Sequence, residues 1–169
     1  FIMTALLQAQ NTAGIENYKS LLGIAQDYMF TLVLEFGDER EGRELTNPVG
    51  AGVRLQSSYQ QIRNIIREYY TCCVGPLMNN RLVCCVPTDM EQGDYESRAK
   101  DVERCRQMIE HISDACGLVC RIGVGSILTV DKMEKSYEDG AKALGNSDGS
   151  VAHCRDLPIF CKYEEDYPL

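Results

Sequence analysis

The glycines Gly123 and Gly125, in RIGVGSILTVDKMEKSYEDGAKAL (residues 121–144), are the residues most open to a chemical interpretation. In many proteins, a glycine-rich loop between a strand and a helix binds phosphate through its backbone N–H groups. A dinucleotide-binding loop needs a third glycine, a P-loop needs Gly-Lys-Ser/Thr, and neither follows here. A lone Gly-x-Gly at a strand end is more typical of close backbone packing. We therefore predict a packing role and assign no cofactor-binding residue to this loop.

Cysteine and histidine side chains could bind zinc or form a catalytic pair. The cysteines of a structural zinc site are usually about two to four residues apart, and only Cys116 and Cys120 come near that spacing. His153 and Cys154 lie far along the chain, and no local signature joins a cysteine to His111 or His153 as its base. We assign no metal ligand and no catalytic residue from these spacings.

Four of the cysteines form two adjacent pairs. Cys72-Cys73 and Cys84-Cys85 each lie inside an apolar run, where cysteine commonly behaves as a small buried hydrophobic residue. The total of nine cysteines is odd, which does not fit the paired framework of a secreted, disulfide-rich domain. We expect reduced cysteines and a cytoplasmic protein, and a thiol-based metal or redox sensor stays open as an alternative function.

The charge balance is acidic. Lys and Arg number 17 against 25 Asp and Glu, which gives a net charge of −8. Nucleic-acid binding is driven by basic residues that neutralise phosphates, so we expect this chain to bind no nucleic acid. Acidic residues at Glu39, Glu41, Glu44 and positions 164–166 are most simply solvated surface charges. Alternatively, they repel the DNA that a neighbouring domain binds and leave this face for protein contacts.

At 169 residues, the chain is long enough for one domain with a substantial core. No stretch reaches the roughly 18 to 20 apolar residues of a membrane helix, and FIMTALLQAQ at residues 1–10 lacks the features of a signal peptide. We expect no membrane contact. The chain opens on Phe1 and stops on Pro168-Leu169, where a further element could begin, so we expect it to be a piece of a longer protein.

Short runs rich in β-branched and aromatic residues predict the strands that would carry these side chains. The strands are expected at residues 28–36, 71–77, 81–86, 119–126 and 151–157, the last as an edge strand. Asn79 and Asn80 separate the second and third, and paired asparagines tolerate the positive φ angles of a tight hairpin turn. Residues 37–52 contain four glycines, a proline and mixed charges, and predict a long exposed loop.

Apolar residues at helical spacing predict three helices that pack on this sheet. The helices are expected over residues 58–70, 95–116 and 132–144, with these apolar faces: Ile62, Ile65, Ile66 and Tyr69; Val102, Cys105, Ile109, Ile112 and Cys116; Met133, Tyr137, Ala141 and Leu144. Gly117 is well placed to end the second helix and Asp131 to cap the third. A weaker pattern over residues 1–26 predicts a helical arm of two short helices.

This order of elements resembles the degenerate GGDEF-like domain, of nucleotide-cyclase fold, that AraC-type bacterial response regulators carry between a receiver and a DNA-binding domain. The resemblance covers roughly residues 28–169, and its sharpest part is residues 122–144, which look like the family's Ile-Gly-Ile-Gly strand end followed by a Ser-Tyr-x-Glu-Ala-x-x-Ala-Leu helix. The matching positions are Gly123, Gly125, Ser136, Tyr137, Ala143 and Leu144. Asp139 stands where Glu is usual and Gly140 where Ala is usual. The closing IFCKYEEDYPL also resembles the family's run into Tyr-Pro before a linker helix.

The resemblance also implies which residues catalysis would need. An active GGDEF enzyme joins two GTP molecules with divalent metal held by carboxylates at the first strand and at the hairpin turn, because charge building on the phosphoryl group must be neutralised. Here the first strand offers only Glu35, and the turn reads PLMNNR (residues 76–81), with no carboxylate and no paired glycines. Hard metal ions need several oxygen ligands. We therefore predict that the chain is not an enzyme and holds no metal or cofactor.

The fold we predict is α+β: a mainly antiparallel five-stranded sheet with packed helices, like a nucleotide-cyclase domain without its active site. Residues 1–26 would form a helical arm and residues 27–169 a degenerate GGDEF-like regulatory domain.

The function we predict is non-catalytic signal relay in a bacterial transcription regulator of the AraC type, in a two-component system. The domain would act between a sensor or receiver and a helix-turn-helix domain outside this chain, as a homodimer through its arm or by binding an unidentified small ligand. Two alternative functions stay open. One is a nucleotide-binding or residual cyclase domain, and the other is the thiol-based metal or redox sensor.

Overall fold

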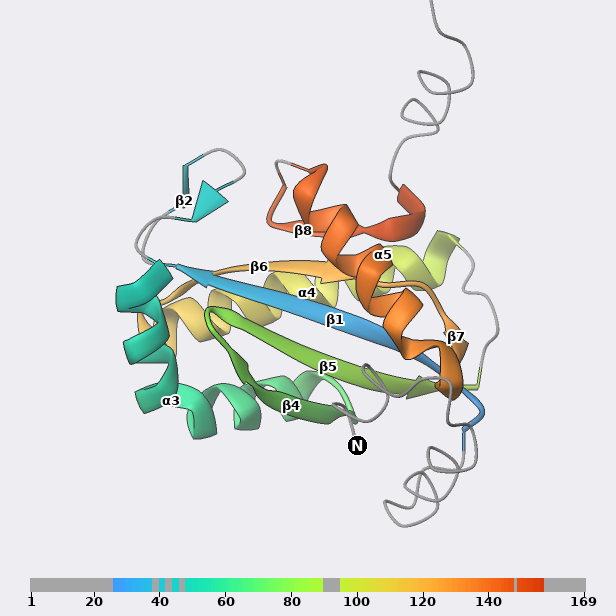
Figure 1. Ribbon diagram of the computed structural model, residues 1–169, viewed down its shortest axis with the longest axis horizontal. Coiled ribbons are helices and arrows are strands. Elements are labelled where there is room, and N and C mark those ends of the chain that lie inside the picture. Colours follow the sequence, from blue (N-terminus) through green and yellow to red (C-terminus); the bar gives the residue numbers. More distant parts are fainter. Residues whose placement is uncertain are drawn as a thin grey trace, which may run out of the picture.

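The apolar run YMFTLVLEFG forms the central strand β1 (Tyr28–Gly37) of the sheet in the computed structural model (Figure 1). The structure describes residues 26–37, 40–41, 44–45, 48–89, 95–147 and 149–156. The predicted arm, apart from its last residue, and the closing residues 157–169 lie outside these ranges. So do the side chains of the acidic residues at positions 39, 41, 44 and 164–166.

The sheet is mixed. Besides β1 it contains β4 (Cys73–Met78), β5 (Arg81–Thr88), β6 (Val119–Val124), the short β7 (Leu128–Thr129) and β8 (Val151–His153). The strand order is β4-β5-β1-β6-β8, with β7 paired to the beginning of β1. The pairs β1–β5, β1–β6, β1–β7 and β4–β5 are antiparallel, whereas β6–β8 is parallel. β2 (Arg40–Glu41) and β3 (Glu44–Leu45) form a separate ribbon.

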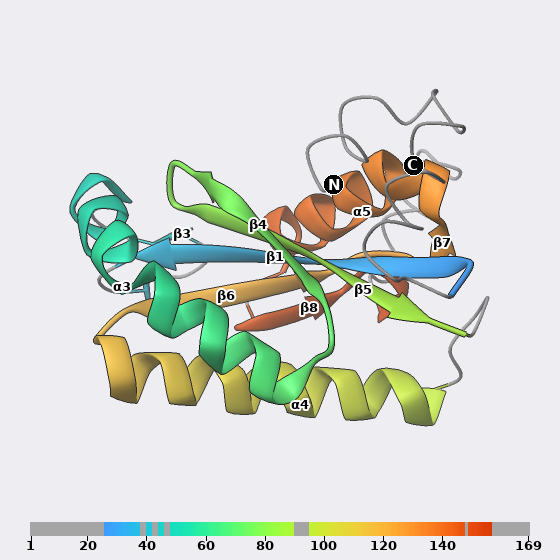
Figure 2. The same ribbon diagram turned by 90° about the horizontal axis from the view of Figure 1, so that it is seen from below.

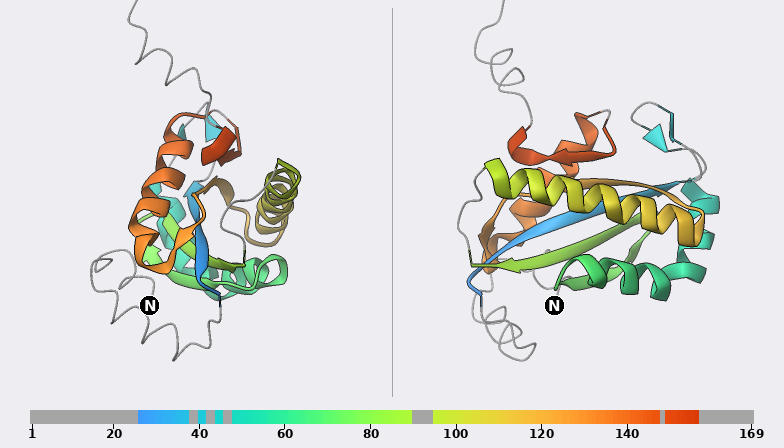
Figure 3. Two further views of the ribbon diagram at one scale, coloured as in Figure 1. Left: turned by 90° about the vertical axis from the view of Figure 1, so that its right-hand side faces the viewer. Right: turned by 180° about the vertical axis from the view of Figure 1, so that it is seen from behind.

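Helices cover both faces of the sheet. α3 (Pro48–Tyr69) and α4 (Tyr95–Cys116) lie on one face and α5 (Met133–Gly145) on the other (Figures 2 and 3). Two short 3-10 helices, η1 (Val130–Lys132) and η2 (Cys154–Asp156), flank α5 and β8. In β1–α3–β4 and in β5–α4–β6 the two strands are parallel with one strand between them, so both are split β-α-β units. None of the helices in the described ranges has both the length and the apolar composition needed to cross a bilayer.

The side chains of β1 alternate between two cores, because successive strand residues point to opposite faces. Leu32, Leu34 and Phe36 belong to the larger core beneath α3 and α4. Met29 belongs to a smaller core with Val130 and Met133 beneath α5. A strand buried on both faces is apolar throughout, which is why this run carries no clear alternation in the sequence.

The prediction of a loop over residues 37–52 is wrong, because the β2–β3 ribbon and the beginning of α3 lie within it. α3 begins at Pro48 rather than at residue 58, and Leu55 in its added part is completely buried. Proline is well suited to the first position of a helix, where its missing N–H has no helical partner, so here it starts a helix instead of interrupting one.

Smaller differences concern helix faces and ends. Met108 joins the buried face of α4, and Ala143, not Ala141, is fully buried in α5. The prediction that Asp131 caps the third helix is wrong, since Asp131 lies in η1 and Lys132 precedes α5 without a side-chain cap bond. The last strand ends at His153, because the chain turns into η2.

Two local predictions are confirmed. Gly117 follows α4 with φ of 68°, and its N–H donates to the Ser113 carbonyl at 2.9 Å, as expected of a glycine that ends a helix. Asn79 adopts φ of 57° in the hairpin between β4 and β5.

Candidate functional site

The Gly123 and Gly125 backbone is pressed against α5. A Cβ atom at Gly123 would overlap the carbonyl oxygen of Gly140, and one at Gly125 would overlap the carbonyl of Ser136 and lie 2.6 Å from its Oγ. A Cβ atom added at Gly140 would lie 3.0 Å from a methyl group of Val33. The predicted packing role of the glycine pair is confirmed, because only residues without side chains allow strand end and helix to approach this closely.

The polar groups of this loop are already satisfied within the chain. The Gly125 N–H donates to the Thr31 carbonyl at 2.8 Å, and the Thr31 N–H donates to Ser136 Oγ at 3.0 Å. Ser136 Oγ then donates to the Ser126 carbonyl at 2.7 Å, and Ser126 Oγ donates to Asp139 at 2.6 Å. A phosphate would meet the Asp139 carboxylate here, and the Gly125 N–H is already bonded, which disfavours an anion at this loop.

The end of β1 beside the β4–β5 hairpin contains an internal ion pair. Glu35 on β1 and Arg81 on β5 are direct partners across the strands. The Arg81 guanidinium donates through Nε and Nη2 to one Glu35 oxygen at 3.2 and 3.1 Å. A third bond runs from Arg81 Nη1 to the Tyr137 hydroxyl at 3.3 Å. Burial lowers the pKa of Arg81, but the bonds to Tyr137 and Glu35 outweigh it and raise the pKa overall.

The hairpin turn is tied to the end of β1 by asparagine. The Asn80 side-chain amide donates to the Phe36 carbonyl at 3.1 Å, and the Phe36 N–H donates to the Asn80 carbonyl at 2.9 Å. The turn therefore uses its polar groups to close the sheet. Glu35 is the carboxylate that the sequence indicated at this end of the first strand, and it faces a guanidinium.

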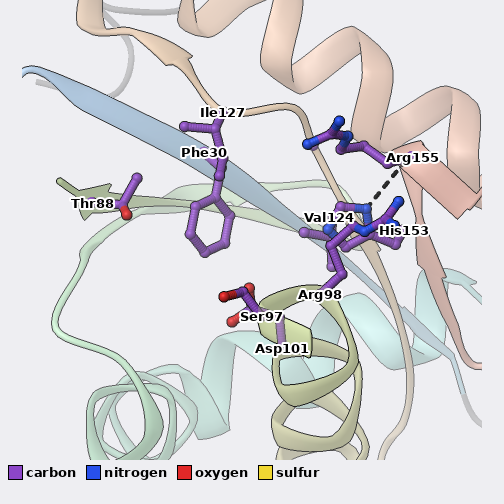
Figure 4. Close-up of a pocket in the computed structure, with 10 residues that line it drawn as sticks. Phe30, Thr88, Ser97, Arg98, Asp101, Val124, Ile127, His153 and Arg155 are labelled. Carbon is purple, nitrogen blue, oxygen red and sulfur yellow. Dashed lines mark hydrogen bonds between the residues drawn. The ribbon is translucent and has the colours of Figure 1, made fainter. Parts of the chain in front are cut away.

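A small cavity lies at the opposite end of β1, between the first turns of α4 and the strand ends of the sheet (Figure 4). Its volume is about 60 Å³. Phe30, Val124 and Ile127 form its apolar wall, and Ser97 and Asp101 approach from α4. This size suits a small polar group more than a nucleotide, since ligand pockets for drug-sized molecules run to about 300 Å³ or more.

The charged residues of the cavity come from two distant segments. Arg98 belongs to α4, while His153 and Arg155 come from β8 and η2. The Arg155 N–H donates to His153 Nδ1 at 3.2 Å, which places the proton of a neutral imidazole on Nε2. With two arginines against one aspartate, the lining has an excess of positive charge. It could therefore accept the carboxylate or similar anionic group of a small ligand.

Asp101 connects the cavity with the core. The Tyr70 hydroxyl donates to Asp101 Oδ1 at 2.8 Å, and burial raises the pKa of Tyr70, which keeps this hydroxyl protonated as a donor. The Tyr70 ring packs edge-on against Phe30, with centroids 6.2 Å apart, and Arg104 lies 4.9 Å from its centre. The cavity wall is thus continuous with an aromatic contact between β1 and the residue that follows α3, and Arg104 of α4 lies over the same ring.

The cysteines and histidines do not converge on a metal site. The eight cysteines in the described ranges are free, and among these residues no group of three or more His, Cys, Asp or Glu side chains is placed to hold a metal ion. Cys120 lies on β6 with its side chain in the larger core, while Cys116 lies at the end of α4. His111 Nδ1 lies 3.3 Å from the Tyr69 hydroxyl and 3.7 Å from Glu68, so its contacts are structural.

Arg121 is a residue whose role the sequence analysis missed. It is 2% exposed, and its guanidinium donates to the carbonyls of Leu144 at 2.9 Å, Ser147 at 2.6 Å and Gly149 at 3.4 Å. These bonds hold the end of α5 and the following turn against β6. The sequence contained one indication of this role, an arginine inside the apolar run VCRIGV.

Comparison of the chain with models of known protein families and with the sequences of curated proteins gives no match. Any family assignment therefore depends on the residues and the topology described above.

Proposed function

We propose that this chain is a non-catalytic regulatory domain of a bacterial transcription regulator, of the degenerate GGDEF-like kind carried by AraC-type response regulators. It relays a signal between a sensor or receiver and a DNA-binding domain outside this chain. Two features support the family: the interleaved split β-α-β units, and the fit of the Gly123-x-Gly125 strand end against Ser136 and Gly140 of α5.

The observation that carries the non-catalytic part is the ion pair between Glu35 and Arg81. Phosphoryl transfer needs metal ions that bridge the substrate phosphates, and these ions need carboxylate ligands. In this chain the Arg81 guanidinium is paired with the Glu35 carboxylate, and the adjacent turn offers asparagine amides in place of carboxylates. A metal ion at Glu35 would have to displace this guanidinium and break its two hydrogen bonds to the carboxylate. The domain accordingly keeps the sheet of a cyclase and uses this end of it for stability.

The cavity beside Arg98, His153 and Arg155 provides a place for a ligand signal to enter. It joins α4 to β8 and η2, and η2 directly precedes the residues that would lead into a following domain. A small anionic ligand there would draw the arginines of both segments together. Ligand binding would thereby change the position of η2 relative to α4.

The enzymatic alternative is tested by incubating the protein with GTP and magnesium or manganese and separating the products by chromatography. We expect no cyclic dinucleotide above the buffer blank. Arg81→Ala, which releases Glu35, should be equally inactive, because a single carboxylate does not hold the metal. Turnover by the wild-type chain that disappears in Glu35→Gln would establish a residual cyclase and overturn the proposal.

The relay itself is tested in the longer regulator. Tyr137→Ala should change transcriptional output, because it removes the contact of α5 with Arg81 and with the smaller core. The truncation leaves a cavity that destabilises by about 3 kcal/mol, so thermal melting must first establish that the variant is folded. Tyr137→Phe, which keeps the ring, is the matched control for packing. A folded Tyr137→Ala variant with unchanged output in inducing and non-inducing conditions would make the domain a passive spacer.

A further inference from the structure

The cavity beside the first turns of α4 is lined by charges of both signs. Arg98 of α4 and Arg155 of η2 contribute guanidinium groups, and Asp101 of α4 contributes a carboxylate (Figure 4). Phe30 and Ile127 belong to the apolar wall. The arginines attract an anionic group, but Asp101 would repel a second carboxylate in so confined a space. This lining therefore favours a ligand that carries a positive group as well as a negative one.

Asp101 is held in position from the side of the core. The Tyr70 hydroxyl donates to Asp101 Oδ1 at 2.8 Å, and the Tyr70 ring packs edge-on against Phe30. A carboxylate has about four acceptor positions, so this single bond orients Asp101 and leaves positions for a donor inside the cavity. An ammonium group suits these positions, because a charged donor forms strong hydrogen bonds with a carboxylate.

The size of the cavity limits the ligand. A volume of about 10–15 Å³ holds one water-sized group, so the cavity, at about 60 Å³, has room for roughly four to six non-hydrogen atoms. The free amino acids glycine and alanine are of this size, whereas leucine is larger. In a cavity this small, the carboxylate and the ammonium group of one ligand contact opposite charges of the lining at the same time.

A ligand can reach this cavity from the solvent. Ser97, Arg98 and Asp101 line it from α4 and are half-buried, not fully buried. On the opposite side, Val124 is buried in the larger core. The charged part of the lining thus lies toward the solvent and the apolar part toward the core, which matches an amino acid that enters with its side chain first.

We propose that the cavity binds a small zwitterionic α-amino acid, glycine or alanine, an assignment that rests on the function proposed above and narrows its ligand to a carboxylate with an ammonium group beside it. The ligand carboxylate lies between Arg98 and Arg155, and the ammonium group donates to Asp101. The methyl group of alanine packs on Phe30 and Ile127. Guanidinium–carboxylate and ammonium–carboxylate bonds are both charge-assisted, and together they connect α4 with η2 through the ligand.

The test is isothermal titration calorimetry of the whole chain with L-alanine, propionate and L-leucine. Propionate keeps the carboxylate and the short apolar tail but has no ammonium group, and L-leucine keeps both charges but has a larger side chain. We expect L-alanine to bind, and propionate and L-leucine to bind more weakly by about tenfold or more, because a site built for a polar group discriminates strongly against a ligand that lacks it.

Asp101→Asn isolates the negative charge, since the amide oxygen can still accept the Tyr70 hydrogen bond. This variant should weaken the binding of L-alanine by about tenfold and strengthen that of propionate, because the repulsion between two carboxylates is gone. Asp114→Asn, at an exposed position near the other end of α4, is the matched control and should change neither affinity. Arg155→Gln should weaken both ligands, because each presents a carboxylate.

The outcomes separate this assignment from the function proposed above. Equal affinity of the wild-type chain for L-alanine and propionate would overturn the amino-acid assignment and leave the cavity as a site for a simple anion. Absence of binding by L-alanine, glycine and propionate at millimolar concentration would overturn both the assignment and the ligand role of the cavity. The wild-type comparison decides the question even if a substitution at Asp101 prevents folding.

Discussion

Gly125 is the position at which a single added carbon atom should do the most damage. A Cβ there would meet the Ser136 carbonyl and hydroxyl as well as the Thr31 hydroxyl. The carbonyl belongs to the backbone of α5, and the two hydroxyls are hydrogen-bonded to each other at 3.1 Å. Neither hydroxyl can withdraw without breaking a buried bond. The glycine is therefore required by the contact between β6 and α5.

We predict that Gly125→Ala lowers the free energy of unfolding by about 3 kcal/mol, since overpacking a rigid site forces backbone shifts. Urea denaturation followed by circular dichroism measures the change. Gly145→Ala is the matched control, because an added Cβ at Gly145 meets nothing within 4 Å. Equal stability of the two variants would contradict the close packing.

Arg121 exerts its effect through the backbone carbonyls that it satisfies. Replacing it by Met keeps most of the side-chain volume but leaves the Leu144 and Ser147 carbonyls without their buried donor. We predict a loss of about 3 kcal/mol in the free energy of unfolding. Arg106→Met, at an exposed position with a surface ion pair, should change it by less than about 0.5 kcal/mol. Thermal melting of both variants gives the comparison, and similar melting points would show that the buried guanidinium is dispensable.

At the scale of elements, the hairpin between β4 and β5 depends on the backbone of one turn residue. Among the residues that the structure describes, Asn79 is the non-glycine residue with a positive φ angle. Asparagine and glycine tolerate this conformation, and β-branched residues do not. The turn positions Arg81 opposite Glu35. The same turn therefore controls both the register of the edge strand and the ion pair.

We predict that Asn79→Gly retains the stability of the wild-type chain, whereas Asn79→Val lowers the free energy of unfolding by about 1–2 kcal/mol. Chemical denaturation measures both. Hydrogen exchange of the β4 and β5 amides should localise the effect of Asn79→Val to the hairpin. A loss of stability that is the same for both substitutions would indicate that the asparagine side chain matters instead of its φ angle.

At the scale of the whole molecule, the net charge of −8 governs encounters with polyanions. Affinity for duplex DNA comes largely from basic residues that displace counterions from phosphates. We predict that this chain is not retained on duplex DNA at physiological salt, whereas the longer regulator binds its operator. Gel-shift titration of both proteins with the same duplex tests this prediction. Tight binding by this chain alone would refute the proposal that DNA binding belongs to another domain.

The sequence by itself determined the local elements and the residues that end them. The bounds of the helix at residues 95–116 agree with α4, Gly117 follows it with positive φ, and Asn79 lies in the turn as predicted. The packing role of Gly123 and Gly125 also followed from the absence of a complete phosphate motif. These features depend on hydrophobic period and backbone freedom, which are properties of neighbouring residues. The start of α3, the predicted cap at Asp131 and the end of the last strand were exceptions. Glycine and proline favour loops locally, and the burial of Leu55 reveals the earlier start of α3.

Only the tertiary structure decided which distant side chains meet. Glu35 and Arg81 are 46 positions apart, and Arg121 lies 23 positions before the Leu144 carbonyl that it holds. The cavity collects residues from β1, β5, α4, β6 and η2. The cross-strand pairing of Cys73 with Cys85 likewise depends on the register between β4 and β5. Strand order, register and the side on which each helix crosses set these encounters, and a periodic pattern along the chain does not encode them, because it reports which face of an element is buried and not what that face is buried against.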